Sequence, residues 1–574
     1  MQKQSVTRRW LLGLGIGLVS ALLIAACGGK ASTDSRSEQP APPDQQVLRV
    51  RLPGEPKSLD PHAISVATET TLAKLLFAGL FTYDEELKVI PNLASELPTG
   101  DNGGISKDGL TYTVKLKKDA KWSDGRVLTA SDFAYSMRRA LDPTTAAPYA
   151  SFFHGIVGAK ELNKSFGTKD APKTPSATEL NDLREKLGVV AKDPFTIVYQ
   201  LRQPNPSFLN LMALWTAFPV REDVVEKFGS RWTEPGNNVS NGAFMLKEWM
   251  HDQRIVMEPN PYWQGQKPKL TRVEINFIAD DGAAYAAYSA GDLDVVTLPP
   301  ALAREASTPG SSLNKEFVQQ PTLTTYAFLY NNAIVPFDNP KVRQAFGTAL
   351  DRNAYVEGLL QGAGVPTTSW IPPGMPGYEA SLGKQYELNS AKAKQLLAEA
   401  GFPEGKGLPK VTFLAISNDT NRLVSQFIEA QLKKNLGVDV VTEYVDSRTF
   451  GSRFTANQYQ VTVQRWSADW PYPDNWLPEL FGSGAGNNHV AYSNAKFDEL
   501  IKKARAEVDD KKRLAVYSEA QKLIIDEAVV VPLYNPKMYV LVKPNVRGLV
   551  ITALDGHIKG DYNLHKAYIA AANN

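Results

Sequence analysis

The sequence predicts a mixed α/β fold. Segments in which apolar and polar residues alternate, as in half-buried strands, are interspersed with segments whose apolar residues recur at helical spacing. Both kinds of segment continue through the chain after residue 46, and no long linker interrupts them. If the protein has several lobes, each is therefore expected to be built from non-consecutive segments rather than to follow the other along the chain.

Five segments predict strands. In the first of them, apolar residues alternate with two arginines, so that one face is apolar and the other polar. The same alternation recurs further along the chain. The predicted strands are residues 47–52, 110–116, 196–201, 255–257 and 273–278.

Three segments predict amphipathic helices. Residues 391–400 have helical periodicity, follow the cap-type residues Asn389 and Ser390, and are ended by Gly401. A second periodic segment ends at a glycine as well. The three predicted helices are residues 391–400, 421–435 and 512–526.

Residues 121–133 predict a turn followed by a capped helix. Asp124 and Gly125 form a hairpin-type dipeptide, and Thr129 has an aspartate three residues later, as in a capping box. The apolar residues that follow lie on one helical face: Phe133, Met137 and Leu141. Each of these residues has a structural role, so residues 121–133 predict local structure and no functional site.

The composition is that of an ordinary soluble globular protein. Of the 574 residues, 43% are hydrophobic and 22% are charged, which excludes a disordered, collagen-like or polytopic membrane protein. The 63 basic and 61 acidic residues give a net charge of +2. We therefore expect no nucleic-acid partner.

The only cysteine, Cys27, follows a segment typical of export signals. Three basic residues lie among the first nine, and residues 10–26 are uncharged and end in two alanines. Small residues directly before a cysteine resemble the bacterial lipobox, in which that cysteine is lipidated and becomes the mature N-terminus. We expect residues 1–26 to be a lipoprotein signal peptide and Cys27 to carry the lipid.

Alternatives to this interpretation stay open. A retained anchor helix and a plain secretory signal are the other possibilities, and the pair Arg8-Arg9 leaves twin-arginine export open beside the general route. Residues 27–46 contain three prolines and no large apolar side chain, which predicts a flexible tether. A single cysteine excludes an intrachain disulfide and a cysteine-based zinc site.

A search for catalytic motifs finds none. The six histidines form no HExxH or other metal-binding spacing, and the chain has neither a nucleophile elbow nor a P-loop. We therefore predict no catalytic residue, no metal and no cofactor. A hydrolase built from scattered serine or carboxylate side chains stays open as an alternative.

Asp469 is the strongest candidate for a binding residue. It lies just past an alternating segment that ends before two prolines, and in α/β sheets that edge faces the ligand crevice. A carboxylate among aromatic rings suits an ammonium group. The aromatic neighbours are Trp466, Trp470, Tyr472 and Trp476. A solvated loop aspartate beside core tryptophans is the alternative.

Several short sequence motifs occur in the order typical of one known family. They cover residues 58–62, 76–80, 121–133, 148–151, 241–244, 261–263, 291–294, 342–345, 351–352 and 494–500. Through them, about residues 47–545 resemble the oligopeptide-binding lipoproteins of ABC importers, within the peptide/nickel-type solute-binding family.

The resemblance implies a class-II periplasmic-binding-protein fold, in which two hinged α/β lobes close on a ligand beside an extra third region. It implies this division: residues 47–77, 203–318 and 537–574 for lobe I, 78–202 for the extra region, and 319–536 for lobe II.

The resemblance also implies how a ligand is held. Family members bind an extended peptide between the lobes, and a family aspartate that pairs with the peptide ammonium matches Asp469. Main-chain pairing is implied for Arg465 and Ser467, and across the cleft for Ser65, Val66 and Ala67. The further ligand-binding residues implied are Trp466, Tyr149, Tyr326, Asn487, Asn488 and Tyr534. Val463 stands where some members have an arginine for the ligand carboxylate, which leaves peptide length open, with Arg465 as a nearby candidate.

We therefore expect a monomeric, lipid-anchored receptor in the periplasm or at the cell surface. It would deliver oligopeptides to the transmembrane subunits of an ABC permease and their ATPases, without cofactors or nucleic acid. Within the family, a dipeptide, murein peptide, nickel chelate or unrelated solute is the alternative ligand. Outside it, the alternatives are a lipoprotein hydrolase and an adhesive surface protein.

Overall fold

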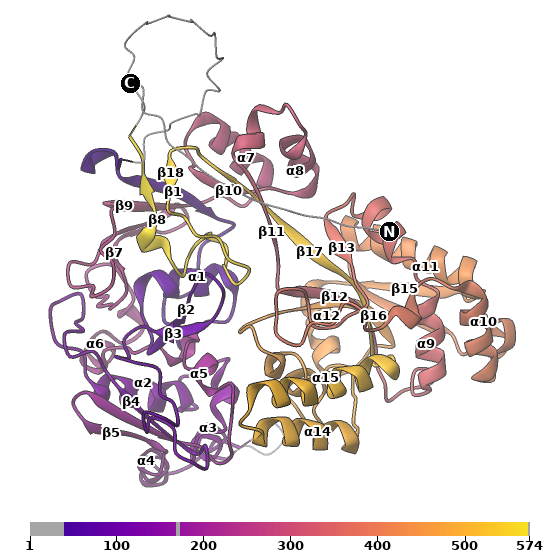
Figure 1. Cartoon of the computed structure of the whole chain (residues 1–574), viewed down its shortest axis with the longest axis horizontal. Coiled ribbons are helices and arrows are strands. Elements are labelled where there is room, and N and C mark those ends of the chain that lie inside the picture. Colours follow the sequence, from indigo (N-terminus) through magenta and orange to yellow (C-terminus); the bar gives the residue numbers. More distant parts are fainter. Residues whose placement is uncertain (1–38, 168–172, 572–574) are drawn as a thin grey trace, which may run out of the picture.

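A computed structural model describes residues 39–167 and 173–571 of the protein. The predicted signal peptide, Cys27 and most of the predicted tether lie outside these described residues. Two large sheets dominate the fold: segments coloured indigo to magenta gather around one, and orange segments gather around the other (Figure 1).

The first large sheet joins the start of the chain to a segment more than 200 residues later. Its strand order is β1 (Val47–Leu52), β9 (Arg272–Phe277), β8 (Arg254–Pro259) and β7 (Phe244–Met250). β1 and β9 run parallel, and the other pairs are antiparallel. The predicted alternation of β1 is confirmed, because Leu48, Val50 and Leu52 are buried.

The second large sheet carries the candidate site. Its strands are β10 (Val295–Thr297), β17 (Val530–Val542), β12 (Thr324–Tyr330), β16 (Val461–Ser467), β14 (Val411–Ile416) and β15 (Val440–Val445), with β11 (Phe317–Pro321) and β13 (Gly364–Pro366) paired to β17. β16 lies between β12, which is antiparallel to it, and β14, which is parallel.

β17 passes between the two halves of the molecule (Figure 1). Up to Tyr534 it pairs with β12, and from Lys537 onward it pairs with β11 and then β10. Pro536 and Pro321 lie at this changeover, and neither has an N–H to donate to the ladder. The ladder therefore lacks these two backbone donors at the changeover, where β13 also pairs with β17.

A smaller sheet and two strand pairs complete the β structure. They are β4 (Thr111–Lys115), β6 (Thr196–Gln200) and β5 (Val189–Asp193), then β2 (Phe81–Tyr83) with β3 (Val89–Pro91) and β18 (Val546–Arg547) with β19 (Tyr568–Ile569). The α-helices are α1 (Ala67–Leu76), α2 (Ala130–Leu141), α3 (Ala159–Asn163), α4 (Ala177–Glu185), α5 (Phe208–Leu211), α6 (Glu222–Phe228), α7 (Asp281–Ala290), α8 (Pro300–Ser307), α9 (Pro340–Thr348), α10 (Ser390–Glu399), α11 (Asp419–Leu436), α12 (Ser447–Thr455), α13 (Pro478–Phe481), α14 (Ala495–Ala506) and α15 (Asp510–Asp526).

All the predicted elements are confirmed. The five predicted strands are β1, β4, β6, β8 and β9, and the three predicted helices are α10, α11 and α15, with every boundary within two residues. The predicted start of α2 is also confirmed, because the Asp132 carboxylate accepts a hydrogen bond from the backbone N–H of Thr129 at 2.8 Å.

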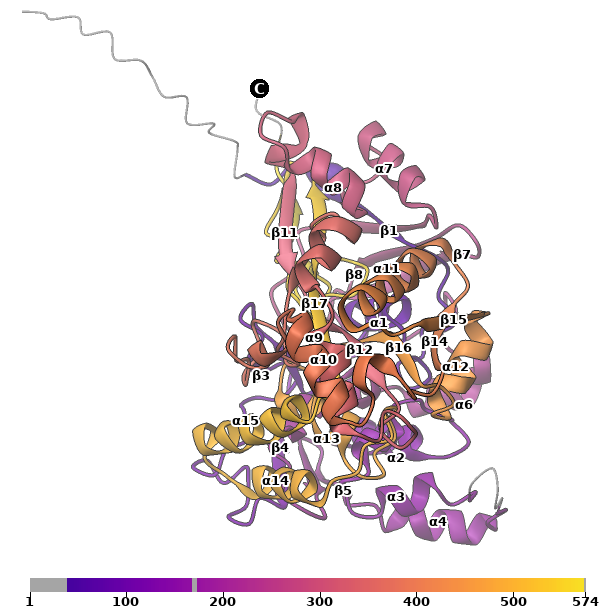
Figure 2. The same cartoon turned by 90° about the vertical axis from the view of Figure 1, so that its right-hand side faces the viewer.

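α14 and α15 lie at one end of the molecule and α7 and α8 at the other (Figure 2). None of the helices in the described ranges has the length and apolar character needed to cross a bilayer.

A buried ion pair fixes α2 to the segment before α1. The Arg139 guanidinium donates to both carboxylate oxygens of Asp60, at 3.0 and 2.5 Å, and to Nδ1 of His62 at 2.9 Å. His62 Nε2 donates to the Phe218 carbonyl oxygen at 3.0 Å. Burial and the charge of Arg139 lower the pKa of His62 to about 4, so the imidazole stays neutral and can accept from Arg139.

Arg139→Met should destabilise the protein by about 3–5 kcal/mol, because it leaves the Asp60 carboxylate buried without its partner. Urea denaturation measures this loss. Lys433→Met is the control: it removes an exposed ion pair with Asp439 and should cost less than about 1 kcal/mol. Equal losses for the two variants would contradict the importance of the buried pair.

Candidate functional site

Asp469 lies two residues beyond the end of β16 and contacts the other half of the molecule. Its Oδ1 accepts a hydrogen bond from the Tyr149 hydroxyl at 2.9 Å, and its Oδ2 accepts one from Asn475 Nδ2 at 3.3 Å. Tyr149 precedes Asp469 by 320 residues. The carboxylate therefore lies where two distant parts of the chain meet.

The Asp469 carboxylate has neutral donors but no counter-ion. Among residues 39–167 and 173–571, no lysine, arginine or histidine nitrogen lies within 4.0 Å of it. Burial raises the pKa of Asp469 to about 6, against the lowering effect of the hydrogen bonds from Tyr149 and Asn475. A cation that arrived at this carboxylate would therefore stabilise its ionised form.

Asn475 holds Asp469 in position, and sequence reasoning missed it. Its side chain is fully buried. Its Oδ1 accepts from the Asp469 backbone N–H at 2.9 Å and from Trp466 Nε1 at 3.3 Å, while its amide nitrogen donates to the carboxylate. One asparagine thus fixes both the main chain and the side chain of Asp469.

The last residues of β16 leave one strand edge without a partner strand. The Ala468 N–H donates to the Leu323 carbonyl, so by antiparallel alternation the backbone groups of Arg465 and Ser467 point away from β12. On their other side, β14 pairs with β16 only where Phe413 lies opposite Val461. An extended chain could pair with this edge.

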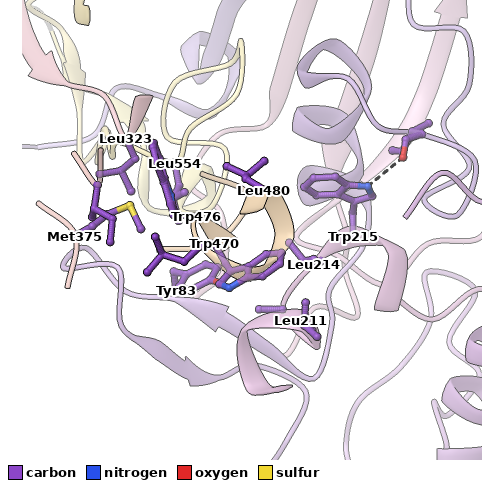
Figure 3. Close-up of a cluster of buried hydrophobic side chains, with 14 of the residues drawn as sticks. Tyr83, Leu211, Leu214, Trp215, Leu323, Met375, Trp470, Trp476, Leu480 and Leu554 are labelled. Atoms are coloured by element: carbon purple, nitrogen blue, oxygen red, sulfur yellow. Dashed lines mark hydrogen bonds between the residues drawn. The ribbon is translucent and has the colours of Figure 1, made fainter. Parts of the chain in front are cut away.

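The segment before α1 provides the opposite wall. Ser65 lines the cavities described next, Val66 is the exposed N-cap residue of α1, and Ala67 is its first residue. Trp215 Nε1 donates to the Ile64 carbonyl at 3.2 Å and so fixes this segment (Figure 3).

Two cavities share Ser65 as a lining residue: Asp469 lines the first, and its hydrogen-bond partner Tyr149 lines the second. The first cavity, of about 720 Å³, is lined by Ala67, Arg465, Ser467 and Asp469 among others. The second cavity, of about 910 Å³, is lined by Tyr149, Trp466 and Asn487 among others. Both volumes are typical of ligand pockets. The structure thus brings together most of the predicted site residues.

Aromatic residues form the buried boundary around Asp469. The rings of Phe152 and Trp470 meet edge to face with centroids 5.4 Å apart, and Tyr149 lies 5.1 Å from Trp215. Figure 3 shows Trp470 and Trp476 with Leu480, near Tyr83 and Trp215 of the other half. This packing excludes water from one side of the carboxylate.

Four predicted residues are not among those that line the two cavities: Val66, Tyr326, Asn488 and Tyr534. Tyr326 accepts a hydrogen bond from Arg465 Nη1 at 2.6 Å and stacks on the buried Tyr534, with centroids 4.7 Å apart. Asn488 donates to the carbonyls of Gly482 and Tyr492, at 3.0 and 2.7 Å, and so holds its own loop. These contacts support the site from outside the cavities.

The structure gives no sign of a metal centre. Within the described part of the chain, no group of three or more histidine, aspartate or glutamate side chains is arranged to hold a metal ion. The chemistry available at this site is that of hydrogen bonding, charge pairing and aromatic contact.

A sequence model of the bacterial extracellular solute-binding proteins, family 5 (Middle), matches residues 88–488. The chain belongs to this family. It is also 33% identical over 553 residues to the periplasmic oligopeptide-binding protein OppA of Salmonella typhimurium, which covers 95% of this chain and 96% of that protein. The predicted family is therefore confirmed.

Solved structures of relatives confirm the fold of this solute-binding protein. The Escherichia coli murein tripeptide binding protein MppA matches with a TM-score of 0.74 and 28% identity, over 93% of this chain and 99% of that one. Haemophilus influenzae OppA in complex with RPPGFSPFR matches with a TM-score of 0.72 and 29% identity, over 93% and 100%. The solute-binding protein has the predicted class-II α/β binding-protein fold.

Asp469→Asn should stabilise the ligand-free solute-binding protein by about 1–3 kcal/mol at pH 7. The pKa of Asp469 is raised by folding, so the native carboxyl binds more protons than the unfolded one, and stability falls as pH rises from about 4 to about 6. The Asp469→Asn side chain does not ionise, so the variant does not undergo this fall in stability. Denaturation at pH 4 and pH 7, after refolding to remove ligand, should show the gain only at pH 7.

Asp474→Asn is the matched control and should have the opposite effect. The Asp474 carboxylate is buried and accepts from Arg505 at 3.0 and 3.3 Å and from the Tyr517 hydroxyl at 2.7 Å. Removing its charge should cost about 3–5 kcal/mol, because Arg505 loses its main partner. If both variants were destabilised alike, Asp469 would be an ordinary structural carboxylate.

Proposed function

We propose that this protein captures oligopeptides in an extended conformation between its lobes and delivers them to an ABC permease, without catalysing a reaction. The observation that carries the proposal is the Asp469 carboxylate, which has no counter-ion among the described residues and lies two residues beyond an open strand edge. Relatives named as oligopeptide-, murein peptide- and dipeptide-binding proteins support a peptide ligand.

The α-ammonium group of the peptide would bind Asp469 between the Tyr149 hydroxyl and the Asn475 amide. The peptide main chain would then pair with the outward backbone groups of Ser467 and Arg465, as in strand addition. Because main-chain groups are the same for every sequence, this pairing gives affinity without sequence preference. The side chains would enter the two cavities, whose volumes leave room for water.

Closure would complete the site. In this proposal residues 47–77, 203–318 and 537–574 form lobe I, 78–202 the extra region and 319–536 lobe II, and the lobes move about β11 and β17. The Tyr149–Asp469 hydrogen bond joins the extra region to lobe II. A bound ammonium would add charge attraction to this contact and so favour the closed form, which the permease would recognise.

The identity of the ligand is tested by mass spectrometry of molecules released from purified protein on denaturation. Co-purified peptides of mixed sequence support the proposal. A metal chelate, a sugar or a bile acid would contradict it, and a single dipeptide or murein peptide would narrow it to one of the related receptors. Incubation with mixed peptides should yield no cleavage products.

Asp469→Asn should weaken the binding of free-amine peptides by about 2–5 kcal/mol, since it removes one partner of a buried charge pair. N-acetylated peptides carry no ammonium and should lose much less affinity. Isothermal titration calorimetry with both kinds of peptide measures the difference. The exposed Asp439 offers a control, and Asp439→Asn should leave both affinities unchanged. Equal losses for acetylated and free peptides would remove Asp469 from this role.

We also propose that Cys27 anchors the mature protein to a membrane outside the cytoplasm, in the periplasm or at the cell surface. A covalent lipid would supply the anchor, because the chain itself is almost neutral. Cys27→Ser should release the protein from the membrane fraction while leaving peptide affinity intact. Fractionation of cells followed by immunoblotting measures this, and continued membrane retention of the variant would contradict it.

A further inference from the structure

Lys559 is a buried cation whose hydrogen bonds are incomplete. It lies in the C-terminal segment that lines the first cavity, and the residue is only 8% exposed. Its Nζ donates to the Gly556 carbonyl oxygen at 2.6 Å, and no carboxylate of the described residues lies within 4.0 Å of it. An ammonium group has three donors, so two of them have no acceptor in the described part of the chain.

The nearby carboxylates are already bound to other groups. Asp561 accepts from the Thr71 hydroxyl at 2.7 Å and from the Gly556 N–H at 2.9 Å, and it pairs with Lys74 at 3.3 Å. Asp555 accepts from Thr552, through its N–H and its hydroxyl, and from the Gly560 N–H. The charges of Asp555 and Asp561 stabilise the positive charge of Lys559 from a distance, but neither carboxylate accepts a hydrogen bond from its ammonium group.

Two other cations in the wall of the first cavity also lack an acidic partner. Arg465 donates to the Tyr326 hydroxyl, and Lys537 Nζ lies 3.4 Å from the Gly362 carbonyl oxygen. Neither has a described carboxylate within 4.0 Å. Of the remaining cations of this wall, Arg51 pairs with Asp281 at 2.5 Å, and Lys74 with Asp561.

His557, which lines the same cavity, adds no charge at neutral pH. Burial and the nearby positive groups lower the pKa of His557 to about 4. Among the described residues, three cations that line the first cavity have no carboxylate within 4.0 Å: Arg465, Lys537 and Lys559. Two carboxylates that line it, Asp469 and Asp555, have no cation within that distance, and Asp555 is bound by Thr552 and Gly560. A guest carrying one ammonium alone would leave this positive side of the cavity unpaired.

We propose that the first cavity binds a carboxylate group of the ligand, with Lys559 as its buried partner and Arg465 and Lys537 as further cations. This inference rests on the proposed peptide-binding function and deepens it, because it assigns a charge preference to one of the two cavities. A buried ammonium without partners is costly, and a charged oxygen is the acceptor that satisfies it best. The carboxylate is either an acidic side chain or the carboxyl terminus of a short peptide.

Calorimetry with matched peptides tests the proposal on the wild-type protein. Glutamate and its neutral isostere glutamine are compared at each position of an alanine tripeptide, and the free-acid tripeptide Ala-Ala-Ala is compared with its C-terminal amide. We expect on the order of tenfold tighter binding of the acid in at least one comparison. A preference at a glutamate position identifies a side chain as the source, and a preference for the free acid identifies the terminus.

Lys559→Met tests whether Lys559 is the partner. The preferred acid should lose its advantage, while the affinity of the matched neutral peptide should change less than about threefold. Lys559→Arg should retain the preference, which a purely structural role of the lysine would not require. Lys433→Met, at an exposed site, is the control and should leave every ratio unchanged. If Lys559→Met does not fold, Lys559→Gln replaces it.

Either of two results would overturn the inference: equal affinities of acid and neutral peptides at every position of the wild type, or a preference that persists in Lys559→Met. Both leave the proposed function intact, because neutral free-amine peptides would still bind. Failure of all the peptides to bind the wild type would instead contradict the proposed function itself.

Discussion

The Asp469 carboxylate is partly buried between two parts of the chain and accepts hydrogen bonds from a hydroxyl and an amide, while no cation of the described residues lies within 4.0 Å of it. The rest of the site depends on this arrangement. Its neutral donors keep the ionised form accessible, while burial keeps it costly. A cation bound beside Asp469 would offset this cost by stabilising the ionised form.

Asp469 and Asp474 lie five residues apart and illustrate two uses of a buried aspartate. Asp474 is neutralised by Arg505 and joins the segment after β16 to α14 and α15. Asp469 is held in place by Asn475 and Tyr149 but is not neutralised. The contacts of Asp474 and Asn475 thus hold the segment around Asp469 in the folded chain. In its proposed role, the Asp469 carboxylate would already be oriented before a ligand binds.

Local patterns in the sequence predicted what depends on local structure. Alternation located β1 and β9, and prolines 471 and 473 located the end of the strand before Asp469. The open edge could not be predicted in this way, because it arises where β14 separates from β16 after one residue pair. Asn475 belongs to no motif, and only the folded chain brings its amide to Asp469.

Lys559 shows the same limit more strongly. It lies in a C-terminal segment without strand or helix periodicity, and its neighbour Asp561 bonds to Thr71, which is 490 residues away in the chain. Burial and missing partners are properties of the assembled cavity, so residue type and spacing could not reveal them. The family resemblance pointed to Asp469 and Arg465 in the wall of the first cavity, but not to Lys559.

The changeover in β17 has a mechanical consequence. β11 and β17 pair as antiparallel strands directly after the changeover, where Pro321 and Pro536 donate no ladder hydrogen bond. Two-stranded ribbons twist more strongly than broad sheets do. In the proposed closure, a change in the twist of this strand pair would accommodate part of the relative motion of the lobes.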